Sequence, residues 1–373
     1  MIDAHGTLIF ERDPSEADSL DEFVRIIEGQ IPESQRLTDI HLDTLGPTWV
    51  MINDHLYPTN ATPVPQIITE DAKMHLSTHA QHLFDTEQDA GGRLKRADGS
   101  IIRMQLYMCD DSISLALRLQ PPRPWTFDQM GIPDHLLDLL ERPQGLVLFA
   151  GAVGSRKTSV LHAMLDTVNR RSEKQRKHIY MIDDPPEFTH LPLHALFHGR
   201  EIGVTTPNYK TAIYGSLRAK PDYLTIGEMR NAETIEAAVL AGSLGRLVMT
   251  TIHSETATQT LTRLIQSFPA DRRDEMNAAL ADVLLAICAF KVVPTVSGGT
   301  ALAYEILRKN DQTRNLLDDP VQLRGALDDP GCADMNSFET CLSEMYRKSI
   351  ITRESAEKYA PDPSRLTLDS SQR

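Results

Sequence analysis

The sequence has few of the features that mark secreted, metal-binding and membrane-spanning proteins. Four cysteines occur in its 373 residues: Cys109, Cys288, Cys332 and Cys341. None of them forms a Cys-x-x-Cys pair or stands at zinc-ligand spacing, and nothing suggests a disulfide framework. We therefore expect small core side chains in a reducing compartment. The most apolar run, residues 281–294, is interrupted by Lys291 and is too short to cross a bilayer.

Positive charge is also scarce. Lysine and arginine number 38 against 52 aspartates and glutamates, which gives a formal net charge of −14. A surface this acidic repels phosphate backbones and anionic lipids, so we expect no direct, large-area contact with nucleic acid. The N-terminus has no basic segment followed by an apolar one, which argues against a secretory signal and favours a cytoplasmic protein.

The first 120 residues predict a small mixed α/β domain. Residues 1–19 are acidic with little apolar periodicity, and we expect them to be loosely held. From residue 20 onwards, Phe23, Ile26 and Ile27 are spaced like one face of a helix. Strand-like alternation follows, and two such runs on either side of residues 109–112 (Cys-Asp-Asp-Ser) predict a hairpin. This domain is expected to span residues 20–120.

A proline-rich segment, residues 121–133, separates this domain from the rest. Four prolines in thirteen residues cannot continue a helix or an inner strand, so we interpret the segment as a linker. The pattern then changes to continuous apolar runs of the kind found in parallel strands buried on both faces. These runs are residues 145–151, 177–184, 221–228 and 246–253.

The alternation of these runs with helical segments predicts a doubly wound, mostly parallel sheet in residues 134–373. In such sheets ligands bind beyond the carboxyl ends of the strands, so the polar residues that end the runs should converge on one region. Helices are expected to follow, from residues 258–268 to residues 354–362.

The turn after the first run is nearly a phosphate-binding loop. Residues 151–161, Gly-Ala-Val-Gly-Ser-Arg-Lys-Thr-Ser-Val-Leu, follow an apolar strand and open a helix, as the motif G-x-x-x-x-G-K-[ST] requires. Backbone N–H groups and the helix N-terminus would hold phosphates, Lys157 would reach the β/γ oxygens and Thr158 would bind Mg²⁺. The expected ATP-binding residues are Gly151, Val153, Gly154, Ser155, Arg156, Lys157, Thr158 and Ser159.

Arg156 stands where the motif has glycine. If the backbone there needs a positive φ, a residue other than glycine costs roughly 1–2 kcal/mol. The arginine side chain could also add a cation near the phosphates and offset that cost in part. Chain geometry alone does not fix the sign of the effect.

Acids and a histidine end the other three runs. Asp183 and Asp184 end the second run, Glu228 ends the third and His253 ends the fourth. Acids in this position hold Mg²⁺ or its waters and orient the attacking water, and a histidine could donate to the γ-phosphate. The alternative is solvated charges, helix caps and a structural histidine. Arg230, beside Glu228, could pair with phosphates or with these acids.

At these motifs the sequence resembles the PilT-like secretion ATPases. Residues 142–159, 181–190, 216–245 and 250–257 resemble the Walker A, Asp box, Walker B and His box of that family, in order and at the right intervals. The sequence similarity to the family extends from about residue 20 to about residue 365. The chain length and the His-box sequence look closest to the DotB/TraJ branch, which serves type IV secretion and plasmid conjugation.

The resemblance implies a hexameric ring ATPase with ATP and Mg²⁺ as ligands. Its fold class would be α/β: a RecA-like domain, a mostly parallel sheet with flanking helices, preceded by a small PAS-like α+β domain. The ring would be cytoplasmic and would reach the inner membrane only through partner proteins of the secretion or conjugation machinery.

The resemblance also assigns roles to individual residues. Glu228 matches the Walker B acid, a Mg²⁺ ligand together with Thr158, and His253 matches the His-box histidine. Lys157 matches the phosphate-binding lysine. Asp183 takes the place of the water-orienting acid. Two arginines on strands of the N-terminal domain, Arg103 and Arg118, match arginines that complete the site when the domains close.

Several positions depart from the family pattern. Besides Arg156, the Asp box begins with Asp183 where a glutamate is usual, Arg246 replaces a frequent histidine, and Asn231 replaces an aspartate. These changes leave three functions open. The leading one is an ATPase that energises type IV secretion or conjugation. The others are a ring subunit that binds nucleotide but barely hydrolyses it, and an ATPase that retracts a pilus.

Overall fold

The structure, a computed structural model, divides into two compact units. It describes residues 3, 6–32, 35, 37–53, 55–63, 65–87, 89–120, 124–171, 173–310, 313, 319–329 and 334–368. Unit 1 contains residues 1–123 and 185–191, and unit 2 contains residues 124–184 and 192–373. Cys332 and the first three residues of the expected linker lie outside the described residues.

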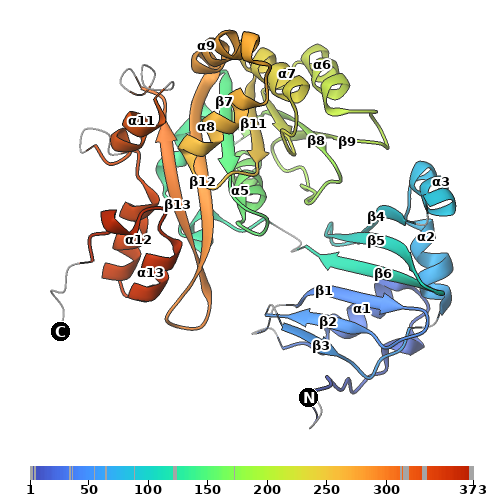
Figure 1. Cartoon of the computed structure of the whole chain (residues 1–373). Coiled ribbons are helices and arrows are strands. Elements are labelled where there is room, and N and C mark those ends of the chain that lie inside the picture. Colours follow the sequence, from blue (N-terminus) through green and yellow to red (C-terminus); the bar gives the residue numbers. More distant parts are fainter. Residues whose placement is uncertain are drawn as a thin grey trace. The chain divides into compact units, whose positions relative to one another are not determined.

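Unit 1 is built on a six-stranded antiparallel sheet with the order β3-β2-β1-β6-β5-β4 (Figure 1). Its strands are β1 (Leu37–Asp43), β2 (Trp49–Ile52), β3 (His55–Pro58), β4 (Asp89–Lys95), β5 (Ile101–Cys109) and β6 (Ser112–Leu119). Its helical segments are η1 (Pro14–Glu16), α1 (Leu20–Glu28), η2 (Ile67–Asp71), α2 (Ala72–Met74) and α3 (Thr78–Glu87).

The predicted hairpin and helix of unit 1 are present. Cys109 pairs with Ser112 across the β5–β6 turn. Its side chain is exposed, so the expectation of a core cysteine is wrong at this position. Cys288 and Cys341 are buried, as small core side chains should be. Helix α1 begins at the cap residue Ser19, whose hydroxyl accepts from the backbone N–H of the third helical residue.

The expectation of a loosely held N-terminus is corrected for residues 6–19. Leu8 and Phe10 are buried in the core of unit 1. The N–H of Leu8 donates to the carbonyl of Pro58 at 2.8 Å, and the N–H of Phe10 donates to the side chain of Asn60 at 2.8 Å. The segment is rich in acidic residues, but its alternating apolar residues Leu8 and Phe10 pack into the core beside the edge strand β3.

Unit 2 is built on a seven-stranded sheet with the order β13-β12-β7-β11-β10-β8-β9 (Figure 1). Its strands are β7 (Gly145–Ala150), β8 (His178–Asp183), β9 (Leu196–Glu201), β10 (Tyr223–Ile226), β11 (Leu247–Ile252), β12 (Leu284–Pro294) and β13 (Thr300–Arg308). Neighbouring strands are parallel except for the β12–β13 pair.

Helices cover both faces of this sheet. They are α4 (Phe127–Met130), η3 (Asp134–Glu141), α5 (Lys157–Asn169), η4 (Glu173–Gln175), α6 (Tyr209–Ala219), α7 (Ala232–Ser243), α8 (Ala257–Gln266), η5 (Ala270–Arg272), α9 (Arg273–Val283), α11 (Pro320–Ala326), α12 (Phe338–Arg347), α13 (Arg353–Tyr359) and η6 (Pro363–Arg365). Along β7, Leu146 and Leu148 face the core with α6–α9, whereas Val147 and Phe149 face the core with η3 and α5. None of the helices in the described residues has the length and apolarity needed to span a bilayer.

Helices follow residue 258 as expected, but the expectation did not include two strands among them, β12 and β13. Residues 284–294 form a strand beside β7, and the chain returns antiparallel as β13. A short apolar run that is buried on both faces has no period that separates strand from helix. In Figure 1, α12 and α13 lie beside these two strands.

The expected linker is shorter in the structure than residues 121–133. Phe127, Met130 and Ile132 are buried in the core of unit 2, and Thr126 opens α4 with a capping box. The helix fits between Pro124 and Pro133 and ends at Gly131, which has a left-handed conformation with φ 66°.

Glu305 on β13 joins two helices of unit 2. Its buried carboxylate accepts from the N–H of Ala257 at 2.7 Å and from the N–H of Phe338 at 3.4 Å, the first residues of α8 and α12. Burial raises the pKa of Glu305 to about 7. The contact fixes the start of α8, which follows the strand end that carries His253.

Candidate nucleotide-binding site

The loop between β7 and α5 is so closely packed that it requires a glycine at its first residue. Gly151 has φ 153°, and a Cβ added to it would lie 2.1 Å from Ser155 Oγ and 2.8 Å from the carbonyl oxygen of Phe290, so glycine is required there. Ser155 Oγ is buried and has no hydrogen-bond partner among the described residues. The exposed backbone at residues 152–154 and the N-terminus of α5 together suit a bound phosphate.

Three strand ends meet at this loop. Lys157 Nζ lies 3.4 Å from His253 Nδ1, and His253 Nε2 lies 3.4 Å from Glu228 Oε1. Lys157 also donates to the carbonyl of Ala152 at 3.2 Å. The register explains the meeting: Ala150 at the end of β7 pairs with Ile252 at the end of β11.

This geometry defines the protonation of His253. A lysine ammonium has no acceptor, so Nδ1 must accept from Lys157, which leaves the proton on Nε2 facing the Glu228 carboxylate. Burial first, and then the positive charge of Lys157, lower the pKa of His253, although Glu228 acts in the opposite direction. The geometry and the direction of this pKa shift both favour the neutral imidazole.

Arg230 and Asp184 extend the same row of charges. Arg230 Nε donates to Glu228 Oε2 at 2.8 Å, and its Nη1 lies 3.7 Å from Asp184 Oδ2. Of the two pairings that the sequence left open for Arg230, the structure has the one with the acids. The resulting row runs from Lys157 through His253 and Glu228 to Asp184.

Asp183 precedes Asp184 at the end of β8 and is buried. A Cβ added to Gly227 would lie 3.1 Å from Asp183 Oδ1 and 3.3 Å from the hydroxyl of Tyr209. Gly227 therefore lets β10 pass close to both groups. Burial, and then the charges of Asp184 and Asp183, raise the pKa of Tyr209. Sequence reasoning missed Tyr209, because a tyrosine at the start of a helix carries no motif.

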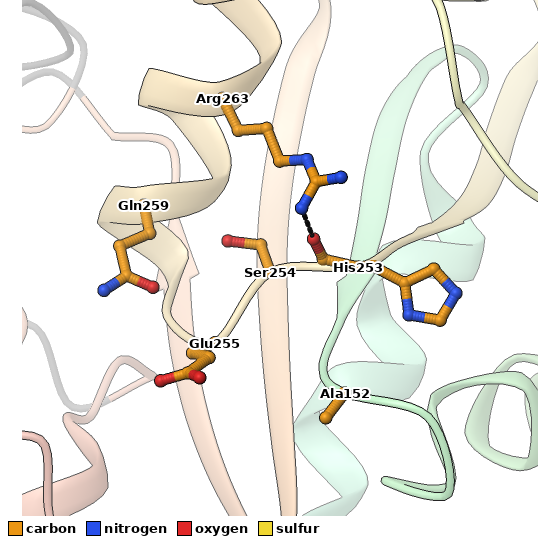
Figure 2. Close-up of a pocket in the computed structure, with 6 residues that line it drawn as sticks. All are labelled: Ala152, His253, Ser254, Glu255, Gln259 and Arg263. Carbon is orange, nitrogen blue, oxygen red and sulfur yellow. Dashed lines mark hydrogen bonds between the residues drawn. The ribbon is translucent and has the colours of Figure 1, made fainter.

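A cavity of about 500 Å³ opens beside His253. It is lined by Ala152, His253, Ser254, Glu255, Gln259 and Arg263. Figure 2 shows the His253 ring directed away from Glu255 and Gln259, while the Arg263 guanidinium donates to the His253 carbonyl. Arg263 thus supports the backbone of the histidine. No sequence signal marked it, since it is one cation within an ordinary amphipathic helix.

The donor set suits a magnesium ion bound together with a nucleotide. In the described residues no three histidine, cysteine, aspartate or glutamate side chains are grouped as a metal site. Mg²⁺ beside a nucleotide takes most of its ligands from phosphate oxygens and water, with one or two from the protein. Thr158, in the first turn of α5, and Glu228 are the residues that would hold it.

The sequence of this chain is similar to the sequences of known proteins. Residues 106–340 match the family described as Type II/IV secretion system protein. The chain belongs to this family. The Type IV pilus retractation ATPase PilT of Pseudomonas aeruginosa is 32% identical over 263 residues, which are 70% of this chain and 76% of that protein.

Solved structures of the family share the fold. The pilus retraction motor PilT with bound ADP has a TM-score of 0.78 at 29% identity, over 88% of this chain and 95% of that chain. The DotB ATPase of Legionella pneumophila has a TM-score of 0.76 at 22% identity, over 95% and 98%. These findings confirm the resemblance to PilT-like ATPases and the RecA-like fold class with a small N-terminal domain.

Within this secretion-family fold, Arg103 and Arg118 lie in unit 1. They are cross-strand partners on β5 and β6, and Arg93 on β4 pairs with Arg103 in the same row. Glu187 binds Arg103 at 3.0 Å, and Asp39 binds Arg118 at 2.8 Å. Like charges directly opposite each other destabilise a sheet, and the carboxylates of Glu187 and Asp39 offset this cost for Arg103 and Arg118. Sequence reasoning missed Arg93.

The structure explains one departure from the family pattern, Asn231, and shows the backbone strain that accompanies another, Arg156. Asn231 caps α7, since its side chain accepts from the N–H of Thr234 at 2.9 Å, and asparagine caps helices as well as aspartate does. Arg156 has φ 66°, the left-handed conformation that favours glycine, which costs roughly 1–2 kcal/mol.

The His253 contacts predict a titration that two variants move in opposite directions. The pKa of His253 should lie below its usual value of 6.5. Glu228→Gln should lower it further because a negative charge is lost, whereas Lys157→Ala should raise it because a positive charge is lost. An NMR titration, with the signal assigned by its loss in His253→Asn, measures this. A midpoint above 6.5 in the wild type, or equal shifts in both variants, would contradict the geometry.

Proposed function

We propose that the protein is an ATP hydrolase that works as a cytoplasmic homohexameric ring. One observation carries the proposal: Lys157, His253 and Glu228, from three separate strand ends, touch one another beside a phosphate-binding loop. The PilT structure with bound ADP, at 29% identity, supports nucleotide as the ligand.

Each residue of the loop has a part in holding the triphosphate. The backbone of residues 151–156 and the N-terminus of α5 surround the phosphates, and Ser155 Oγ supplies a buried hydroxyl. Lys157 leaves His253 Nδ1 and the carbonyl of Ala152 to bind the β/γ oxygens. Thr158 and Glu228 would hold Mg²⁺, which when bound would supply positive charge beside the phosphates.

Hydrolysis is an in-line attack of water on the γ-phosphorus. Asp183, buried at the end of β8, orients the water and accepts its proton, while Glu228 orders the waters around the phosphates. The neutral His253 stays between Lys157 and Glu228, with its Nε2 proton available to the γ-phosphate. The resemblance to the family gives Arg103 and Arg118 the role of adding positive charge to the reaction, for which they would leave Glu187 and Asp39.

The ATPase proposal predicts loss of turnover in two variants with matched controls. Lys157→Ala and Glu228→Gln should each lower phosphate release by about 10²-fold or more, because charge stabilisation is lost at the γ-phosphate. Lys174→Ala and Glu236→Gln change the same residue types at exposed positions away from the loop and should leave turnover intact. A purified wild type without turnover, or turnover unaffected by both site variants, would refute the proposal.

The role of Asp183 is tested through its neighbour Gly227. Gly227→Ala adds a methyl group 3.1 Å from Asp183 Oδ1, which should displace the carboxylate and lower kcat at least tenfold. The control is Gly215→Ala in α6, where a Cβ meets nothing within 4 Å and should only stabilise the helix. Equal kcat values in the two variants would remove Asp183 from the reaction.

The proposed machine is a type IV secretion or plasmid conjugation apparatus of the inner membrane, reached through partner proteins. The shared fold of DotB over nearly the whole chain supports this choice. A second candidate, pilus retraction, is favoured by the 32% identity with the retraction ATPase PilT. The two candidates share the ring and the reaction and differ in the membrane partner.

Capture of the membrane partner separates these candidates. The ring, bound to a non-hydrolysable ATP analogue, is incubated with detergent-solubilised inner membranes of its host, and retained proteins are identified by mass spectrometry. We expect an inner-membrane component of a secretion or conjugation system. Retention of a pilus platform protein instead would assign the chain to retraction. A ring of Lys157→Ala subunits, which lack the phosphate-binding lysine, controls for the need for bound nucleotide.

A further inference from the structure

Arg156 has contacts that explain why the chain keeps it in a left-handed conformation. Its guanidinium carbon lies 4.5 Å from the centre of the Trp125 ring. Its Nη2 donates to Thr300 Oγ1 at 2.8 Å. Arg156 is therefore in contact with two segments far from the loop in the sequence: the residues that enter unit 2 before α4, and the first residue of β13.

The direction of this side chain matters for the loop. Arg156 is the last residue before α5, and the next residue is Lys157, the phosphate-binding lysine. A side chain held at both Trp125 and Thr300 fixes the backbone of residues 155–157 against the sheet. Glycine at this position would be free of strain but would leave the end of the loop without either contact.

Arginine is the residue type that this arrangement requires. Its planar guanidinium can stack on an aromatic ring and donate a hydrogen bond at the same time, which a lysine ammonium does less well. The guanidinium is held by Trp125 and Thr300, so its positive charge contributes to anchoring the loop.

We propose that Arg156 is a positioning residue that holds the phosphate loop in its nucleotide-binding conformation by anchoring it to Trp125 and Thr300. The proposal rests on the proposed function and deepens it. A loop that is only partly in the competent conformation binds nucleotide more weakly in proportion to that fraction, whereas saturating nucleotide restores the conformation. Loss of the anchor should therefore weaken binding and leave the rate at saturation nearly unchanged.

The test measures binding and turnover separately in the full-length ring. Calorimetry gives the Kd for ADP, and phosphate release gives kcat at saturating ATP. Arg156→Gly and Trp125→Leu should each raise the Kd for ADP by about three- to tenfold, with kcat changed less than twofold. Trp125→Phe keeps an aromatic ring and should restore most of the affinity. The double variant Arg156→Gly with Trp125→Leu should bind no more weakly than Arg156→Gly alone, since that change already removes the contact with Trp125.

A matched control and a stability measurement exclude a merely structural effect. Arg272→Ala removes another arginine that lies over a ring, 6.0 Å from the centre of Phe268, and should leave the Kd unchanged. Thermal unfolding of Arg156→Gly should show no loss of stability, because a strained residue has been replaced by glycine.

Two results would overturn the proposal. If Arg156→Gly binds ADP as tightly as the wild type, the loop needs no anchor. If Arg156→Gly weakens binding while Trp125→Leu does not, Arg156 acts on the phosphates directly. A wild type that binds no nucleotide would instead refute the proposed function, so the two failures are distinguishable.

Discussion

The site depends on the parallel pairing of four strands. Because β7, β11, β10 and β8 run side by side in one direction, their carboxyl ends lie along one edge of the sheet. Asp183 is the last residue of β8, and His253 and Glu228 follow the ends of β11 and β10 within two residues. Lys157 opens α5, which the phosphate loop connects to the end of β7. The contacts of 3.4 Å on each side of His253 result from this register, and a shift of one residue in one strand would separate them.

The surroundings of this row serve to keep it in place. Arg263 supports the His253 backbone from α8, and Glu305 fixes the start of that helix from β13. Arg156 reaches β13 as well, at Thr300. The antiparallel strand β13, which belongs to no nucleotide-binding motif, thus contacts both the phosphate loop, through Thr300, and the start of α8, through Glu305.

The sequence predicted the parallel strands and the residues at their ends because each run is apolar and ends in a charged or polar group. It did not predict β12, since a continuously buried run has no period, and it did not predict the packing of Leu8 and Phe10. Tyr209, Arg263 and Arg93 were missed because their place depends on tertiary contacts. The strain at Arg156 was foreseen as a possibility, whereas its contact with Trp125, 31 positions earlier, could come only from the fold.

The most direct measurement is a structure of the protein with Mg²⁺ and a non-hydrolysable ATP analogue. The account predicts the β- and γ-phosphates within the loop of residues 151–157, with Lys157 moved from Ala152 to the phosphates and with His253 and Glu228 beside the γ-phosphate. A nucleotide bound away from this loop, or a γ-phosphate out of reach of both Lys157 and Glu228, would contradict it.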